Sequence, residues 1–177
     1  MCLGSIVRTA LAPWTSADIT IAMAGGRYEG ALRDIIHAFK YEGRRSLADP
    51  LAGVMREAGA RMIEECDCVV PVPLHPWRRI RRGFNQARDL AKRLDRPVVD
   101  ALLRVRATSS QMTLAAEARH RNVRDAFMLA PWSRSFDRHT VLLVDDVRTT
   151  GATLNACAAV LRRAGAAEVR ALTIAAA

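Results

Sequence analysis

One short segment, residues 141–153, restricts the possible folds of this chain more than any other feature. Four consecutive apolar residues, Val-Leu-Leu-Val, precede the acidic pair Asp145 and Asp146, and a turn rich in threonine and glycine follows. A short apolar run of this kind is typical of a strand buried on both faces, as in a parallel sheet covered by helices. The segment therefore predicts a strand, a tight turn and the start of a helix.

Apolar periodicity and turn residues predict the remaining elements. The expected helices cover residues 30–41, 46–64, 85–94 and 151–164. The expected strands cover residues 68–73, 98–105, 126–129, 140–144 and 168–174, and residues 114–122 form a short helix or an ordered loop. Because strands and helices alternate from residue 66 onward, we expect an α/β fold with a parallel sheet flanked by helices. Residues 66–177 would form this core and residues 1–65 a small helical hood, together one compact unit.

The turn after the acidic pair has the chemistry of a phosphate site. A turn that opens a helix presents unpaired backbone N–H groups and the positive end of the helix dipole, and both attract a phosphate. Gly151 permits close approach of the backbone, and three threonine hydroxyls add donors, those of Thr149, Thr150 and Thr153. In open α/β sheets ligands bind beyond the carboxyl ends of the strands, which is where this turn lies.

The acidic pair cannot bind phosphate, because ionised carboxylates are acceptors only. Asp145 and Asp146 suit the two hydroxyls of a ribose instead, directly or through water bound to Mg²⁺. An ordinary strand, turn and helix with capping threonines would explain Thr150. It would not explain two carboxylates at the end of a buried strand, where unpaired burial is costly.

The chain is strongly basic, with a net charge of +9 and a pI of about 10.6. Such a balance favours polyanionic partners, either nucleic acid or phosphate-rich substrates. Of the 27 basic residues only Lys40 and Lys92 are lysines, so arginine dominates. The arginine excess also fits the codon bias of a GC-rich genome, so the position of the arginines is more informative than their number.

Composition excludes several other classes. No apolar run is long enough to span a bilayer, and the first residues lack the pattern of a signal peptide, so we expect a cytoplasmic protein with no membrane partner. Four irregularly spaced cysteines favour reduced thiols over disulfides. Cys66 and Cys68 have no second Cys/His pair at zinc spacing, which argues against a metal there.

Residues 141–153 resemble the signature of the type I phosphoribosyltransferases, an apolar strand with an acidic pair followed by Thr-Thr-Gly-x-Thr. Two further segments resemble the ComF, or amidophosphoribosyltransferase-like, branch of that family. They are residues 70–87, Val-Pro-Val-Pro-Leu-His-Pro-Trp-Arg-Arg-Ile-Arg-Arg-Gly-Phe-Asn-Gln-Ala, and residues 106–127. The early motifs Tyr28-x-Gly30 and Phe39-Lys40-Tyr41 also fit, so the resemblance spans nearly all of residues 27–175.

The resemblance implies a site for 5-phosphoribosyl 1-diphosphate and Mg²⁺. Asp145 and Asp146 would be the catalytic pair that holds the ribose, with Mg²⁺ bound through them. The 5-phosphate would bind to Thr149, Thr150, Gly151, Ala152 and Thr153. The loop after the first core strand would bind the diphosphate through Pro73, Leu74, His75, Arg78, Arg79 and Arg82. Taken alone, the run of arginines is more typical of a solvated basic turn, but its place directly after a buried strand favours the diphosphate.

Two further features of the family bear on this chain. Residues 108–122 fall where relatives carry a flexible loop, so Gln111, Arg119 and Arg121 would reach the diphosphate or exclude water, unless the segment is a static surface helix. Many members also begin with a zinc ribbon of paired cysteines, and this chain has only Cys2 there. Either the ribbon is absent or the chain is shortened, and we expect no zinc.

Two functions remain open at this stage. In the first, an enzyme transfers 5-phosphoribose to an unidentified acceptor with loss of diphosphate. In the second, implied by the ComF resemblance, a non-catalytic component of the DNA-uptake machinery binds single-stranded DNA beside a competence helicase. The residues that would then contact nucleic acid are Trp77, Arg78, Arg79, Arg81 and Arg82. Both functions leave assembly into a homo-oligomer open.

Overall fold

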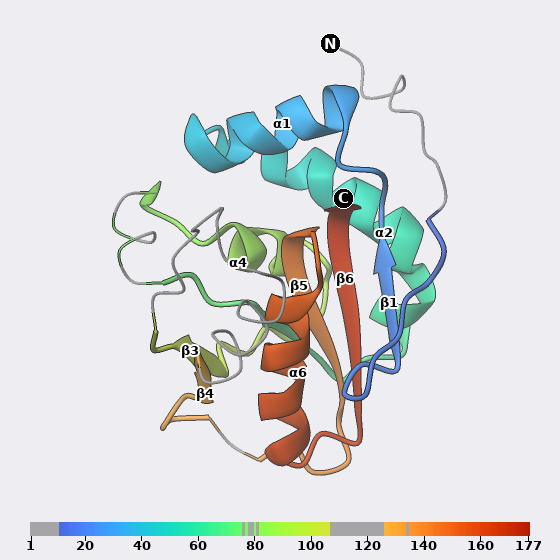
Figure 1. Ribbon diagram of the computed structural model, residues 1–177, viewed down its shortest axis with the longest axis vertical. Helices are drawn as coiled ribbons and strands as arrows, with labels where there is room; N and C mark the ends of the chain where they lie inside the picture. Colours follow the sequence, from blue (N-terminus) through green and yellow to red (C-terminus); the bar gives the residue numbers. More distant parts are fainter. Residues whose placement is uncertain (1–10, 76, 78–79, 81, 107–125, 134) are drawn as a thin grey trace.

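Four parallel strands form the centre of the computed structural model, which describes residues 11–75, 77, 80, 82–106, 126–133 and 135–177. Their order in the sheet is β1-β6-β5-β2 (Figure 1), and every neighbouring pair is parallel. The strands are β1 (Ile21–Ala24), β2 (Cys68–Pro71), β5 (Thr140–Arg148) and β6 (Glu168–Ala176). Helices cover both faces, which confirms the predicted α/β fold class.

The apolar run of residues 141–144 forms the interior of strand β5, and all four side chains are fully buried. Alternation along the strand turns Val141 and Leu143 toward one face and Leu142 and Val144 toward the other. Each fully buried valine or leucine contributes roughly 1.5–3 kcal/mol, so this strand is a main source of the stability of the sheet. Burial on both faces explains why the run contains no polar residue.

Each face of the sheet has its own apolar cluster. Helix α6 (Ala152–Arg163) covers the first face, with Leu154 and Leu161 packed in the cluster around Val141. The second face is covered by α1 (Gly30–Tyr41), α2 (Ala48–Glu64) and α4 (Gln86–Ala91), as Figure 1 shows. A short 3-10 helix, η2 (Arg45–Leu47), joins α1 to α2. The bounds of α1, α2 and α6 agree with the predicted helices within two residues, whereas α4 is shorter than the helix predicted at 85–94.

Helix α2 lies very close to strand β6 because of a glycine. A β-carbon built on Gly59 would come within 2.6 Å of the Leu172 side chain, so a larger residue fits there only if that side chain or the backbone around it shifts. Gly59 also has non-helical backbone angles, and α2 bends at this position. The close contact brings the N-terminal helices down onto the central sheet.

Strand β1 is a feature that the sequence analysis did not predict. Its four residues pair in parallel with β6, from Ile21 opposite Arg170 to Ala24 opposite Thr173. The sequence Ile-Ala-Met-Ala has neither clear alternation nor a flanking proline to mark it as a strand. The N-terminal part therefore adds an edge strand to the sheet as well as the expected helices.

The bounds of the other strand predictions needed correction: β2 ends at Pro71 rather than at residue 73, and β6 runs to Ala176 rather than to residue 174. The strand predicted at 98–105 is shorter, because only β3 (Leu102–Arg104) is regular, and it pairs antiparallel with β4 (Phe127–Leu129) in a separate sheet. Strand β5 is longer than predicted and runs to Arg148, because β6 continues beside it as far as Ala176. The helix or loop predicted at 114–122 lies outside the described residues.

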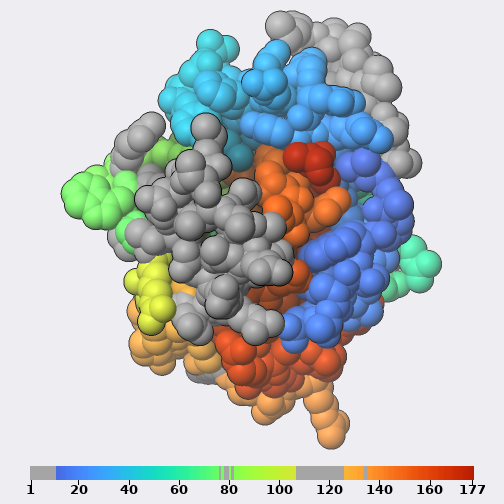
Figure 2. Space-filling model, viewed as in Figure 1, coloured from blue at the N-terminus to red at the C-terminus, as the bar shows by residue number. Residues whose placement is uncertain are grey.

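Helix α1 lies across the carboxyl ends of the central strands, above the end of β6 in Figure 1. Figure 2 shows the same relationship at the surface, where the ends of β5 and β6, in orange and dark red, lie directly beneath the blue surface of α1. No helix in the described part of the chain is long and apolar enough to cross a membrane.

Candidate functional site at the carboxyl end of β5

The acidic pair lies near the carboxyl end of strand β5, where the strand still pairs with β6. The two side chains leave the strand on opposite faces. Asp145 follows Leu143 on the face covered by α6, whereas Asp146 follows Val144 on the face covered by α1. The backbone N–H of Asp146 donates a hydrogen bond of 2.8 Å to Oδ1 of Asp145. The two carboxylates therefore stand on opposite faces of the strand end, and the backbone of one residue binds the side chain of the other.

Asp145 is in an unusual electrostatic position. Desolvation by burial, followed by the charge of Asp146, raises its pKa from 3.8 to about 7. The hydrogen bond from the Asp146 backbone and the charges of Lys40 and Arg104 oppose this rise in pKa. Asp145 thus changes protonation state near neutral pH, as is common for groups in functional sites.

Asp146 forms an ion pair with Lys40, a residue of the N-terminal hood. Nζ of Lys40, in the last turn of α1, lies 2.8 Å from Oδ1 of Asp146, and each side chain is only 13% exposed. The Lys40 ammonium also lies 6.0 Å from the centre of the Tyr28 ring. The sequence analysis named Lys40 only as part of the Phe39-Lys40-Tyr41 motif and gave it no role in the site.

The turn after β5 has the geometry of an open helix N-terminus. Gly151 has φ = 76°, in the left-handed region that favours glycine, and α6 begins at the next residue. Thr149 and Thr150 are exposed, and Oγ1 of Thr150 accepts a long hydrogen bond of 3.4 Å from the N–H of Ala152. Thr153 is half-buried in the first turn of α6. Hydroxyls and the positive end of a helix dipole therefore meet at one exposed point.

A tryptophan supports this turn from the side. A β-carbon at Gly151 would come within 2.9 Å of the ring of Trp14, so the indole lies against the turn. The Arg148 guanidinium lies 5.5 Å from the centre of the same ring. The sequence alone indicated no role for Trp14. No local pattern joins Trp14 to a turn more than 130 residues away, so only the structure reveals this contact.

The loop predicted to bind diphosphate leaves β2 beside the acidic pair. Strand β2 pairs with β5 up to Pro71 opposite Val144, and the N–H of Val72 donates to the Val144 carbonyl at 2.9 Å. Pro73, Leu74 and His75 follow directly, half-buried. Nδ1 of His75 accepts a long hydrogen bond of 3.4 Å from the Trp77 N–H, and Nε2 is the ring nitrogen left to donate to a ligand.

The Arg82 side chain contacts two other residues. Its Nη1 donates to Oε1 of Gln86 at 3.2 Å, and its guanidinium lies 4.7 Å from the centre of the Tyr41 ring. Trp77 is 75% exposed. The other residues predicted for the diphosphate, the nucleic acid and the flexible loop lie outside the described residues, namely Arg78, Arg79, Arg81, Gln111, Arg119 and Arg121.

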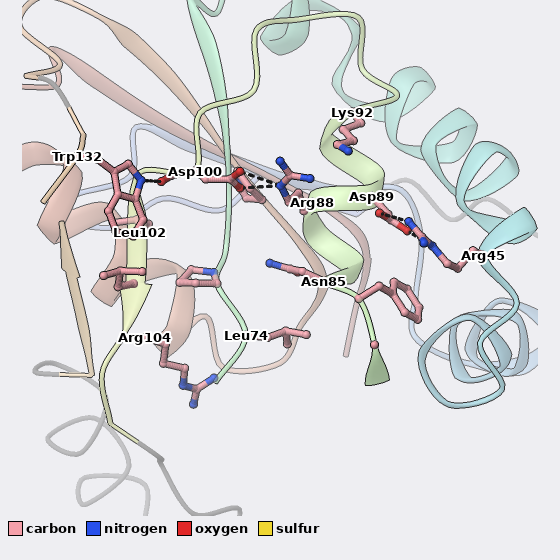
Figure 3. Close-up of a pocket in the computed structure, with 15 residues that line it drawn as sticks. Arg45, Leu74, Asn85, Arg88, Asp89, Lys92, Asp100, Leu102, Arg104 and Trp132 are labelled. Atoms are coloured by element: carbon pink, nitrogen blue, oxygen red, sulfur yellow. Dashed lines mark hydrogen bonds and ion pairs between the residues drawn. The ribbon is translucent and has the colours of Figure 1, made fainter. Parts of the chain in front are cut away.

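A cavity of about 600 Å³ lies beside the loop that follows β2 and is also lined by residues of α4 and β3 (Figure 3). It includes Pro73 and Leu74 but none of the residues of the turn at 149–153. Its charged lining is largely paired internally, by Arg45 with Asp89 and by Arg88 with Asp100. Nε1 of Trp132 donates to the Asp100 carbonyl at 3.3 Å. The cavity contains neither the acidic pair nor the turn at 149–153, so it is a weaker candidate for a sugar-phosphate site than the end of β5.

The acidic pair can supply part of the ligands that Mg²⁺ requires. Among the described residues there is no group of three or more His, Cys, Asp or Glu side chains that could hold a metal. Mg²⁺ is commonly bound by one or two carboxylates together with substrate phosphates and several waters. Asp145 and Asp146 can supply that share of the ligands, so the donor set suits a metal that arrives with a phosphorylated ligand.

Comparison with known proteins agrees with this arrangement. The phosphoribosyl transferase domain family matches residues 80–177, which is more than half of the chain, and the chain belongs to that family. Within the family it is similar to competence protein F of Haemophilus influenzae, with 36% identity over 155 residues that cover 82% of this chain and 68% of the relative. The resemblance inferred from the motifs is therefore confirmed.

Two further relatives are similar over most of the chain. DNA utilization protein YhgH of Escherichia coli is 36% identical over 168 residues, covering 89% of this chain and 70% of the relative. Competence protein ComFC of Bacillus subtilis is 28% identical, covering 83% of this chain and 60% of the relative.

Solved structures with similar folds include phosphoribosyltransferases. The structure titled as the allosteric regulatory enzyme of purine biosynthesis has a TM-score of 0.46 at 20% identity, over 78% of this chain and 30% of that one. Orotate phosphoribosyltransferase from Aeropyrum pernix has a TM-score of 0.44 at 20% identity, over 77% of this chain and 75% of that one.

Proposed function

We propose that this protein binds 5-phosphoribosyl 1-diphosphate together with Mg²⁺ and transfers its phosphoribosyl group to an acceptor. The observation that supports the proposal most strongly is the direct succession, at the carboxyl end of β5, of Asp145, Asp146 and the Gly151 turn that opens α6. A sugar that carries a terminal phosphate needs both parts, acceptors for its hydroxyls and donors for its phosphate.

The site has two arms, the turn at 149–153 and the loop that leaves β2, and each would hold one part of the ligand. The turn at 149–153 would bind the 5-phosphate, and the loop that leaves β2 would bind the diphosphate with Nε2 of His75 and the guanidinium of Arg82 as donors. Mg²⁺, bound with the ligand, would neutralise charge on the diphosphate oxygens. Because β2 and β5 are neighbours, the two arms lie on adjacent strands and can hold the two ends of one small molecule.

The acidic pair would act on the sugar during transfer. The bond between C1 of the ribose and the diphosphate oxygen breaks, the diphosphate leaves with that electron pair, and the acceptor's lone pair forms the new bond to C1. Positive charge develops on the sugar as in glycoside cleavage. The carboxylates of Asp145 and Asp146 hold the ribose and stabilise that charge when both are ionised.

Calorimetry with Mg²⁺ and 5-phosphoribosyl 1-diphosphate tests the proposal. The double variant Asp145→Ala with Asp146→Ala should lose at least about 100-fold in affinity, because two charge-assisted contacts disappear. A control with the same change in charge, Asp34→Ala with Asp49→Ala, alters exposed residues of α1 and α2 and should bind like the wild type. Unchanged affinity in the acidic-pair variant would remove the site from the end of β5.

A second candidate function is binding of single-stranded DNA within the DNA-uptake machinery, beside a helicase. It is favoured by the names of two relatives, competence protein F and DNA utilization protein YhgH, and by the exposed indole of Trp77 next to the arginine run. The acidic-pair variant separates the two functions, since loss of two negative charges should leave DNA affinity equal or higher. Phosphoribosyl transfer remains the primary proposal because the carboxylates have no use in a DNA-binding surface.

A further inference from the structure

The last turn of helix α1 contacts both arms of the site. Three consecutive residues make these contacts, each with a different partner. The Phe39 ring lies 5.6 Å from the Phe84 ring, Nζ of Lys40 lies 2.8 Å from Asp146, and the Tyr41 ring lies 4.7 Å from the Arg82 guanidinium. This turn therefore joins the strand that carries the acidic pair to the segment that follows the diphosphate loop.

The Lys40–Asp146 ion pair differs from the exposed ion pairs of this protein. Both side chains are 13% exposed, so water screens the pair much less than it screens, for example, Arg44 with Glu42 on the surface. The Lys40 ammonium also acts on Asp145, whose pKa it lowers. One cation from the hood thus compensates two adjacent carboxylates that would otherwise repel each other.

We propose, on the basis of the function proposed above, that Lys40 is a tethered counter-ion of the acidic pair, which Mg²⁺ displaces only when it arrives with the diphosphate ligand. The ammonium occupies an oxygen of Asp146, one of the two carboxylates available to a metal at this site. A free divalent cation must compete with a like charge at that oxygen and gains no new anionic partner in return. The metal–ligand complex brings phosphate oxygens, which accept the displaced ammonium.

The position of Lys40 suits such an exchange. Four methylene groups connect its ammonium to the backbone, so the head group can leave Asp146 while the helix stays in place. Arg82, held by the adjacent Tyr41, marks the side on which the diphosphate would lie. Lys40 is therefore a positioning and specificity residue, which selects metal bound to an anionic ligand over free metal.

Binding of free Mn²⁺, measured by electron paramagnetic resonance, tests the counter-ion directly and needs no phosphorylated ligand. Lys40→Met removes the charge and keeps most of the stem, and it should raise the affinity for free Mn²⁺ about 10-fold, the factor that corresponds to about 1.4 kcal/mol. Lys92→Met, at the only other lysine of the chain and on the surface beyond α4, should leave Mn²⁺ affinity unchanged. Adding Asp146→Asn to Lys40→Met should abolish the gain.

A second measurement uses the wild-type protein and so does not depend on the folding of a variant. Lysine labelled with ¹³C at the ε carbon gives only two side-chain signals, from Lys40 and Lys92. Millimolar Mg²⁺ alone should move neither signal, whereas Mg²⁺ with 5-phosphoribosyl 1-diphosphate should shift that of Lys40. Lys40→Arg assigns the signal by removing it.

The results separate this inference from the proposed function. If calorimetry detects no binding of the ligand to the wild type, the proposed function is wrong, and the displacement by ligand is wrong with it. If the ligand binds but Lys40→Met leaves Mn²⁺ affinity unchanged, or the Lys40 signal does not move at saturating ligand, the counter-ion role is wrong while the site stands. A Lys40 signal that shifts with Mg²⁺ alone would also overturn the selection of the metal–ligand complex.

Discussion

The indole of Trp14 lies so close to Gly151 that a β-carbon on the glycine would come within 2.9 Å of the ring. A residue of the N-terminal segment thus packs against a turn at the far end of the sequence. The same turn adopts a left-handed backbone conformation at Gly151 and exposes two threonine hydroxyls. The contact shows that the turn is held from outside as well as by its own sequence.

Gly151→Ala should therefore be more harmful than an ordinary glycine substitution. The left-handed backbone alone should lower the free energy of unfolding by about 1–2 kcal/mol, and overlap with Trp14 should add roughly 1 kcal/mol or more. Gly43→Ala is the matched control, because Gly43 has φ = 66° and open space around its α-carbon. Urea unfolding of both variants measures the difference, and equal losses would show that Trp14 does not restrain the turn.

Stability should fall as the pH rises from about 5 to 8, and Asp145 should be a main cause. Its pKa is raised from 3.8 in the unfolded chain to about 7 in the folded protein, so the folded state holds a proton that the unfolded state has lost. The stabilisation is complete below about pH 4 and disappears as the pH passes 7, a change on the order of 2–4 kcal/mol. Asp145→Asn should flatten the profile of unfolding free energy between pH 5 and 8.

The control for this pH profile is Asp34→Asn, at an exposed position of α1. Its profile should follow that of the wild type. A wild-type profile that rises over the same interval would mean that Asp145 is ionised in the folded protein and that burial does not dominate its environment.

Two ion pairs near the cavity should differ greatly in importance, although both join an arginine to an aspartate. Arg45 binds Asp89 through two hydrogen bonds of 2.8 and 2.9 Å, and the Asp89 side chain is 7% exposed. Arg88 binds Asp100 at 2.8 Å, with side chains 42% and 48% exposed. Asp89→Ala should destabilise the protein by about 1.5–3 kcal/mol, and Asp100→Ala by about 1 kcal/mol or less. Thermal unfolding of the two variants side by side would show whether burial decides the contribution.

The proposed affinity for single-stranded DNA should depend steeply on salt. Replacing Arg78, Arg79, Arg81 and Arg82 by alanine should weaken binding and reduce the slope of log K against log salt, since each phosphate contact contributes about 0.7 to that slope for single strands. Fluorescence anisotropy between about 50 and 200 mM salt measures it. The control removes four exposed arginines elsewhere, Arg33, Arg44, Arg61 and Arg163. A similar loss in both variants would indicate that net charge alone attracts the DNA.

The parts of the molecule that the sequence predicted are those specified by neighbouring residues. The strand, acidic pair, turn and helix from Thr140 to Arg163 form one continuous signal, and the helices at 30–41 and 48–64 follow from their apolar faces. Strand β1 was missed because its four residues become a strand only through pairing with β6. The lengths of β3 and β5 were wrong for the same reason, since partner strands decide where pairing ends.

In the site as well, the residues that could be predicted are neighbours in the sequence, and those that could not are distant from it. Asp145, Asp146 and the turn at 149–153 could be proposed because they are consecutive. Lys40 and Trp14 could not, because each reaches the site from an element more than 100 residues away. A contact between residues so far apart produces no recognisable spacing pattern in the sequence. The motif that contains Lys40 indicated the protein family, but it did not indicate which residue Lys40 contacts.

The strand order β1-β6-β5-β2 has a consequence for synthesis on the ribosome. Strands β1 and β2 are made early, yet each pairs in this sheet only with a strand that is made late, β6 or β5. The four-stranded sheet therefore cannot form until residues 140–176 have emerged, and before then, among the described residues, β1 and β2 have only single bridges to early segments, Ala22 with Trp14 and Val69 with Val98. Folding of the core should be largely post-translational, and this chain should depend on chaperones more than a protein of similar size whose neighbouring strands follow one another in sequence.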